Sequence, residues 1–143
     1  MITQTQGVAR YARFFETLSP DQLADLKHYC TEDVLFVDPF NRVRGVDSMA
    51  AIFWHMYENT DDPAFKVHDW SISGHVAYIF WRFSCRTLGK TIEFDGVSRL
   101  LVGEDGKISE HVDYWDSAGA IWFKVPVIGW VLRLLARRLT LKE

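Results

Sequence analysis

Four polar side chains could carry acid–base chemistry in this chain: Asp38, Arg82, His111 and Asp113. Each stands in a segment where residues alternate as they do in a β-strand with one buried face. A carboxylate in apolar surroundings has a raised pKa, which suits a general acid or base near neutral pH. We therefore expect Asp38 and Asp113 to accept protons. Arg82 would orient Asp113 or a substrate oxygen through a bidentate contact, and His111 would assist.

Strand parity decides which side chains can meet, because neighbours along a strand point to opposite faces. The sets that share a face are Val34, Phe36 and Asp38; Tyr78, Phe80, Arg82 and Ser84; and His111, Asp113 and Trp115. If all three faces look inward, they enclose an aromatic cavity that suits a small apolar molecule. The expected walls are Phe36, Phe53, Trp54, Tyr57, Tyr78, Phe80 and Trp115.

Each of these polar residues also has a structural interpretation. Asp38 precedes Pro39 and could simply form a turn. Arg82 and Asp113 could form an ion pair without a catalytic role, and His111 could be a buried, hydrogen-bonded histidine. These alternatives stay open at the level of sequence.

Motifs for other chemistries are absent from the sequence. The five histidines show no HExxH or paired ligand spacing, so we expect no metal site. There is no GxGxxG, no GxxxxGK[ST] and no GxSxG, and we expect no organic cofactor. Cys30 and Cys85 are expected to be free buried thiols, and no secretory signal is visible, which predicts a cytoplasmic protein.

Charge is unevenly distributed along the chain. Residues 124–143 carry five cations and one acid, a charge of +4, so the net charge of −3 leaves −7 on residues 1–123. An acidic body argues against a nucleic-acid partner.

The order of elements predicts an α+β fold with helices on one face of an antiparallel sheet. Three helices are expected in the first half, near residues 8–15, from Ser19-Pro20 onward, and after Asp47, with Ser19 and Asp47 as caps. Strands are expected at 34–38, 65–73, 75–86, 91–102 and 108–116, and Asp116 could cap a following helix.

The last segment, 119–143, is predicted to be an apolar and basic tail that follows a domain of residues 1–118. From Val127 it has helical periodicity. An amphipathic helix usually closes a core or joins a dimer partner. The alternative is a basic helix that lies on an anionic membrane surface.

Two strings resemble a known superfamily. Residues 13–40, RFFETLSPDQLADLKHYCTEDVLFVDPF, resemble the opening of nuclear transport factor 2-like proteins, above all ketosteroid isomerases and SnoaL-like cyclases. Residues 106–116, GKISEHVDYWD, are similar to the last strand of limonene-epoxide hydrolases and SnoaL-like proteins. The resemblance implies a cone-shaped curved sheet closed by three helices around a pocket, commonly dimeric through the sheet.

The resemblance transfers residue roles unevenly. Asp38 falls where ketosteroid isomerases keep their proton-shuttling carboxylate, but Phe14 and Ser98, which are expected to line the pocket as well, replace the two donors that stabilise the oxyanion. Asp113 and Arg82 fall where limonene-epoxide hydrolases keep an aspartate and an arginine, but Ser84 replaces the second aspartate. SnoaL-like cyclases are similar in keeping a histidine and an acid on the last strand, as His111 and Asp113 do here.

These observations together predict a cofactor-independent acid–base enzyme of isomerase, cyclase or epoxide-hydrolase type. Its substrate would be a small apolar molecule that bears oxygen. The alternative is a non-catalytic module of the same fold that binds a small molecule or lipid. A homodimer is expected through the strand face opposite the pocket, where Ile79, Trp81 and Phe83 are apolar.

Overall fold

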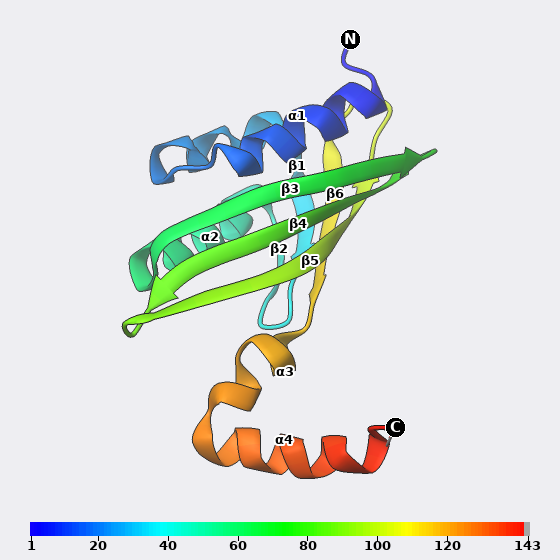
Figure 1. The fold of residues 1–143 in the computed structure, drawn as a ribbon. Coiled ribbons are helices and arrows are strands. Elements are labelled where there is room, and N and C mark those ends of the chain that lie inside the picture. Colours follow the sequence, from blue (N-terminus) through cyan, green and yellow to red (C-terminus); the bar gives the residue numbers. More distant parts are fainter. Residues whose placement is uncertain (142–143) are drawn as a thin grey trace.

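Three long antiparallel strands form the largest part of the fold (Figure 1). The structure, a computed structural model, describes residues 1–141. The strands are β3 (Asp61–Ser73), β4 (Val76–Thr87) and β5 (Lys90–Val102). Gly74 and Gly89 sit in the two connecting turns with φ of 61° and 73°, a region that glycine enters without steric cost.

Three further strands extend this sheet. The order is β2-β1-β6-β5-β4-β3, with β1 at Cys30–Val37, β2 at Arg42–Arg44 and β6 at Ile108–Trp115. Strand β1 runs parallel to β6, whereas all other neighbours are antiparallel. The expected all-antiparallel sheet is therefore corrected at one pairing, and the short β2 was not predicted.

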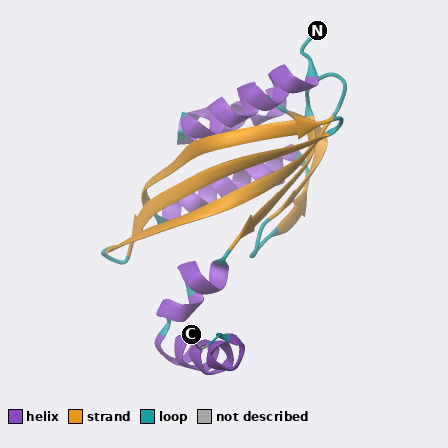
Figure 2. Cartoon of the chain, turned by 45° about the vertical axis from the view of Figure 1, so that its right-hand side comes forward, coloured by secondary structure: helices purple, strands orange, loops and turns teal. Residues whose placement is uncertain are grey.

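Three helices in the first half of the chain pack on one face of the curved sheet, as expected (Figure 2). They are α1 (Gln4–Glu16), the 3₁₀ helix η1 (Pro20–His28) and α2 (Val46–Asn59). Ser19 is the N-cap residue of η1, as expected, but makes no side-chain cap bond, and α2 is preceded by Gly45 rather than capped by Asp47. The fold is thus the expected α+β cone, with an unclosed sheet.

The orientation of β4 is opposite to the expected one. Its inner set is Ala77, Ile79, Trp81, Phe83 and Cys85, all of which are buried. Both faces of this strand carry aromatic rings, so an apolar pattern alone does not decide the parity. The pairing of Arg82 with Asp95 on β5 decides it, because burying an arginine away from such a partner costs far more than partly exposing a ring.

This parity corrects several expectations. Tyr78, Phe80 and Arg82 lie on the outer face of the sheet and do not line the cavity. The surface expected for a dimer, with Ile79, Trp81 and Phe83, is instead part of the core.

A glycine in the middle of β5 allows Trp81 to lie flat across the neighbouring strand. Gly96 pairs with Trp81 on one side and with Trp115 on the other. A Cβ at position 96 would lie 2.3 Å from the Trp81 ring. The missing side chain therefore sets where the indole can lie.

The tail leaves the sheet after Asp116, whose carboxylate accepts a hydrogen bond from the Gly119 backbone N–H at 2.8 Å. It contains α3 (Ser117–Ala120), the short 3₁₀ helix η2 (Trp122–Lys124) and α4 (Pro126–Leu139). Helix α4 stands apart from the sheet and packs mainly on η2 (Figures 1 and 2). The expectation that this helix closes the core of its own chain is therefore wrong.

We expect Gly96→Ala to destabilise the fold by about 1–3 kcal/mol, because the new methyl group must displace the Trp81 ring from a packed core. Urea unfolding followed by circular dichroism measures the change. The control is Lys90→Ala, an exposed position on the same strand, which should change the free energy of unfolding by less than about 0.5 kcal/mol. Equal stability of Gly96→Ala and the control would contradict the packing described above.

Candidate functional site

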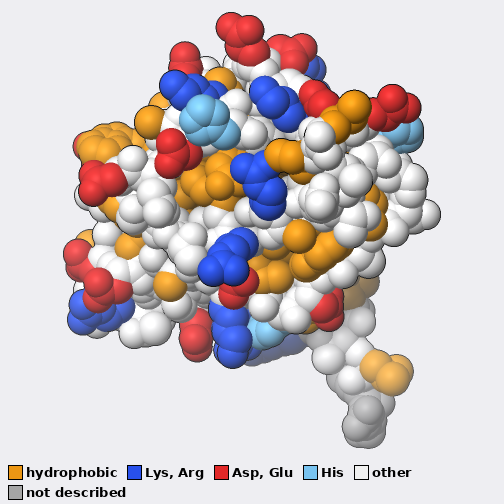
Figure 3. All heavy atoms as spheres, turned by 90° about the horizontal axis from the view of Figure 1, so that it is seen from above, with side chains coloured by type: hydrophobic (Ala, Val, Ile, Leu, Met, Phe, Trp, Pro, Cys, Tyr) orange, Lys and Arg blue, Asp and Glu red, His pale blue; other side chains and the backbone are white. Residues whose placement is uncertain are grey.

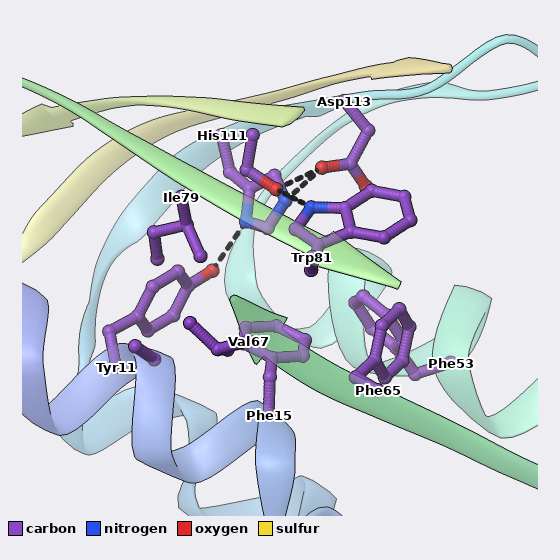
Figure 4. Close-up of a pocket in the computed structure, with 11 residues that line it drawn as sticks. Tyr11, Phe15, Phe53, Phe65, Val67, Ile79, Trp81, His111 and Asp113 are labelled. Carbon is purple, nitrogen blue, oxygen red and sulfur yellow. Dashed lines mark hydrogen bonds and ion pairs between the residues drawn. The ribbon is translucent and has the colours of Figure 1, made fainter. Parts of the chain in front are cut away.

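His111 lies at the centre of a buried hydrogen-bond chain between α1 and β6 (Figure 4). Its Nδ1 is 2.6 Å from the Tyr11 hydroxyl, and its Nε2 is 2.6 Å from Asp113 Oδ1. The side chain of His111 is 4% exposed. Tyr11 comes from the buried stripe of α1, and His111 and Asp113 share the inner face of β6.

The donors and acceptors in this chain have one consistent arrangement. A carboxylate only accepts, so His111 Nε2 carries a proton and donates it to Asp113. The Cys30 thiol donates to the Tyr11 oxygen at 3.8 Å, which leaves the Tyr11 O–H to donate to Nδ1. A neutral imidazole with its proton on Nε2 thus satisfies every group.

Asp113 is held from a second side by β5. The Ser98 hydroxyl donates to Asp113 Oδ1 at 2.5 Å, and Trp81 Nε1–H donates to Ser98 Oγ at 2.8 Å. Ser98 and Asp113 are direct partners in the β5–β6 register. Both hydrogen bonds to Asp113 end on Oδ1, so within residues 1–141 no donor occupies Oδ2. The side chain is 14% exposed, which leaves this oxygen the group able to meet a ligand.

Asp113 lines three cavities: an inner one, an outer one that α2 also lines, and a further open one of about 750 Å³ beside Arg42 and Glu110. The inner one, about 20 Å³, lies beside Tyr11, Ser98 and His111, and it has room for about one water molecule. The outer one is open and measures about 750 Å³. Phe53, Phe65, Trp81 and Asp113 line both the inner and the outer cavity. Asp113 therefore lies between a polar recess and a ligand-sized hollow.

The outer cavity is mainly aromatic. Phe36, Phe53 and Trp115, which the sequence predicted as walls, line it, and Phe94 stacks on Trp115 with ring centroids 4.2 Å apart. The two acids in its lining are Asp38 and Asp113, and its described lining contains no lysine or arginine. His55 also lines it, so its two carboxyl groups outnumber the one side chain that could become cationic.

Asp38 forms a turn at the rim of this cavity. Its Oδ1 accepts hydrogen bonds from the backbone N–H of Phe40 at 2.8 Å and of Asn41 at 2.7 Å. The Asn41 side-chain amide adds a contact at 3.2 Å to the same oxygen. The turn interpretation thus describes the geometry of Asp38, although its carboxylate also lines the cavity.

Arg82 does not approach Asp113. It lies on the outer face, 46% exposed, where its Nε donates to Asp95 Oδ1 at 3.0 Å. Glu93 lies 3.8 Å from its Nη1. The hydrogen bond from Arg82 lowers the pKa of Asp95. Arg82 is therefore a surface ion-pair residue, and its predicted place in the cavity is wrong.

Three other predicted wall residues are placed elsewhere. Trp54 is exposed on α2, and Tyr57 on the same helix is partly buried without lining any of the three described cavities. Phe14 is buried against Phe15 and Tyr29 in the helical layer, with ring centroids 5.5 Å and 4.7 Å away. The predicted Ser98 lies in the inner cavity, bonded to Asp113.

Sequence reasoning missed Tyr11 and Trp81 as site residues. Both were assigned only to apolar faces, of the first helix and of β4. A signal existed for Tyr11, because a tyrosine in a buried stripe needs a partner for its hydroxyl. Trp81 became recognisable only once its strand parity was known.

Burial raises the pKa of the Tyr11 hydroxyl and that of the Cys30 thiol, which contacts it. Desolvation raises the pKa of the Cys30 thiol to about 12, although the Tyr11 contact acts in the opposite direction. Desolvation also raises the pKa of Tyr11, and the neighbouring Cys30 and Asp113 add to the rise. Both groups therefore remain protonated in the folded protein at neutral pH.

Among residues 1–141, no three His, Cys, Asp or Glu side chains are grouped as metal ligands would be.

This pattern predicts that the protein loses stability in alkali. The unfolded chain releases the Cys30 proton near pH 9 and the folded chain near pH 12. The contribution of this thiol to the free energy of unfolding is therefore fully present below about pH 9 and declines as the pH rises above that value. We expect Cys30→Ala to flatten this decline by about 1.4 kcal/mol per pH unit. Urea unfolding of both proteins from neutral to alkaline pH measures the difference. Parallel stability curves would contradict the raised thiol pKa.

The SnoaL-like domain family matches this chain by its sequence profile over residues 11–111. A comparison with curated protein sequences found no match. The range matched contains Tyr11, Ser98 and His111 and ends two residues before Asp113.

Solved structures share the fold at low sequence identity. A protein described as a SnoaL-like polyketide cyclase from Jannaschia sp. CCS1 has a TM-score of 0.71 and 16% identity, covering 83% of this chain and 91% of its own. An LEH-like epoxide hydrolase of M. tuberculosis has a TM-score of 0.69 and 19% identity, covering 93% and 98%. A protein with a ketosteroid isomerase-like fold from Catenulispora acidiphila, solved with trimethylamine, has a TM-score of 0.69 and 14% identity, covering 83% and 92%.

Proposed function

We propose that this chain, which belongs to the SnoaL-like domain family, is a cofactor-independent acid–base enzyme acting on a small, apolar, oxygen-bearing molecule. The observation that carries the proposal is the setting of Asp113. Its Oδ1 is fixed by His111 and Ser98, no donor within residues 1–141 bonds to its Oδ2, and the residue lines an aromatic hollow of about 750 Å³. A fixed carboxylate with one available oxygen is the arrangement that a general base needs.

The hydrogen-bond chain positions this base and does not itself reach the ligand. Tyr11 holds His111, and His111 and Ser98 hold the carboxylate in one rotamer. Donors on one oxygen also polarise the carboxylate toward that side. We therefore assign His111, Ser98 and Tyr11 as positioning residues and Asp113 as the catalytic residue.

A proton cycle on Asp113 needs no external acid. Oδ2 takes a proton from a carbon of the substrate or from a water molecule in the inner cavity. The resulting carboxylic acid then returns that proton to another atom of the substrate, a carbon in an isomerisation or the leaving oxygen in an epoxide opening. Asp113 ends each cycle as a carboxylate, so protons balance for both reactions.

Asp38 contributes charge and shape rather than a second proton acceptor. Three hydrogen bonds to its Oδ1 tie the carboxylate to residues 40 and 41 of its own turn. Asp38 is a rim residue that holds the 38–41 turn at the mouth of the outer cavity. This revises its expected role as a proton acceptor.

We expect Asp113→Asn to reduce turnover by at least about 100-fold, because the amide cannot accept the proton. A panel of apolar epoxides and unsaturated ketones provides the assay. Arg82→Ala is the matched control on the outer face and should retain wild-type turnover. Turnover that survives in Asp113→Asn, or falls in Arg82→Ala, would exclude this assignment.

The charge of the lining predicts a preference among ligands. Because Asp38 and Asp113 face the cavity with no lysine or arginine in the lining, a neutral alcohol should bind at least about 10-fold more tightly than the carboxylate on the same carbon skeleton. Calorimetric titration measures both affinities. Asp113→Asn should reduce the ratio of the alcohol affinity to the carboxylate affinity. Equal affinities, or tighter binding of the carboxylate, in the wild type would contradict this prediction.

The second candidate is a binding module without catalysis. The small size of the inner cavity favours it, since Phe15, Phe53 and Phe65 already fill the space around His111. Native mass spectrometry of freshly purified protein distinguishes the two functions. A retained ligand with no product from the substrate panel would support binding alone.

A further inference from the structure

Helix α4 presents a large apolar surface that its own chain leaves uncovered. Its exposed large apolar residues are Val127, Ile128, Trp130, Val131, Leu134, Leu135 and Leu139, and the exposed Leu141 follows the helix. Gly129 is the one residue of α4 that is buried. Surfaces of this kind on soluble domains mark interaction sites.

The charges around this surface have a single sign. From Ser117 to Leu141 the sequence contains no aspartate or glutamate, whereas Lys124, Arg133, Arg137 and Arg138 are all cationic. By contrast, acidic and basic side chains are interspersed on the face of the molecule that contains α1 (Figure 3). Positive charge is therefore concentrated on the tail of a chain whose body is acidic.

We propose that α4 docks on an anionic lipid surface, with its apolar side in the headgroup region and its cations on lipid phosphates. An apolar helix face flanked by lysine and arginine, with tryptophan near its edge, is the pattern of interfacial helices. A second copy of the helix fits less well, because it would bring Arg137 and Arg138 of two chains together, and residues 117–141 supply no acid to pair with them. The described helix is too short to cross a bilayer, and no helix within residues 1–141 could do so.

The docked geometry would bring the outer cavity close to the lipid. Ile121, at the start of the tail, lines that cavity, and Trp122 packs on Phe40 at its rim with ring centroids 6.0 Å apart. An apolar ligand dissolved in the bilayer would then have a short path to Asp113. The docking itself does not depend on the proposed enzymatic function, because it is measured without substrate.

The test is co-sedimentation of the full chain with vesicles of phosphatidylcholine, with and without phosphatidylserine. We expect binding only when phosphatidylserine is present, and weaker binding at high salt. Arg137→Glu/Arg138→Glu should weaken partitioning at least about 30-fold, since each cation near an anionic surface contributes about fivefold. Val131→Asp/Leu135→Asp should abolish it while circular dichroism remains that of the wild type.

The control is Arg13→Glu/Lys27→Glu, which reverses two exposed cations on α1 and η1 and should bind vesicles as the wild type does. The proposal is overturned if the intact chain does not sediment, if it binds both vesicle types equally, or if the control loses binding to the same extent. It is also overturned if Val131→Asp/Leu135→Asp converts a dimer to a monomer by light scattering while vesicle binding is unchanged. In that case a second copy covers the helix.

Discussion

A carboxylate placed in an aromatic wall has to be hydrogen-bonded, and this requirement fixes much of the molecule. Asp113 obtains its donors from His111 on its own strand and from Ser98 on β5. His111 is held in turn by Tyr11 on α1, so helix and sheet must meet in one register for the carboxylate to be satisfied. The polar chain therefore links the helical layer to the sheet in addition to the apolar packing around it.

The same requirement separates the two acids of the cavity. Asp38 Oδ1 accepts hydrogen bonds from backbone N–H groups of its own turn. Asp113 Oδ1 accepts hydrogen bonds from two side chains, and its Oδ2 has no donor within residues 1–141. Two carboxylates in one lining thus have different chemical capacities, which their position in the sequence does not reveal. SnoaL-like folds support several activities, so the function has to be argued from such local differences.

The sequence predicted the order of elements because periodicity and turn residues report local structure. Strand parity on β1 and β6 agrees with the sequence-based expectation, since Val34, Phe36 and His111 are all buried on the inner face. Parity on β4 was not, because Tyr78 and Phe80 are as aromatic as Trp81 and Phe83. The deciding contact, Arg82 with Asp95, depends on the β4–β5 register, which turns and bulges set and which alternation alone does not give.

Gly96 has a consequence for how this site can vary among related chains. Its missing side chain lets the Trp81 indole lie over β5 and reach Ser98. A relative with a larger residue at position 96 must therefore carry a smaller ring, or none, at position 81. Positions 81, 96 and 98 should thus change together during evolution, and this covariation would mark the relatives that hold their Asp113 carboxylate in the same way.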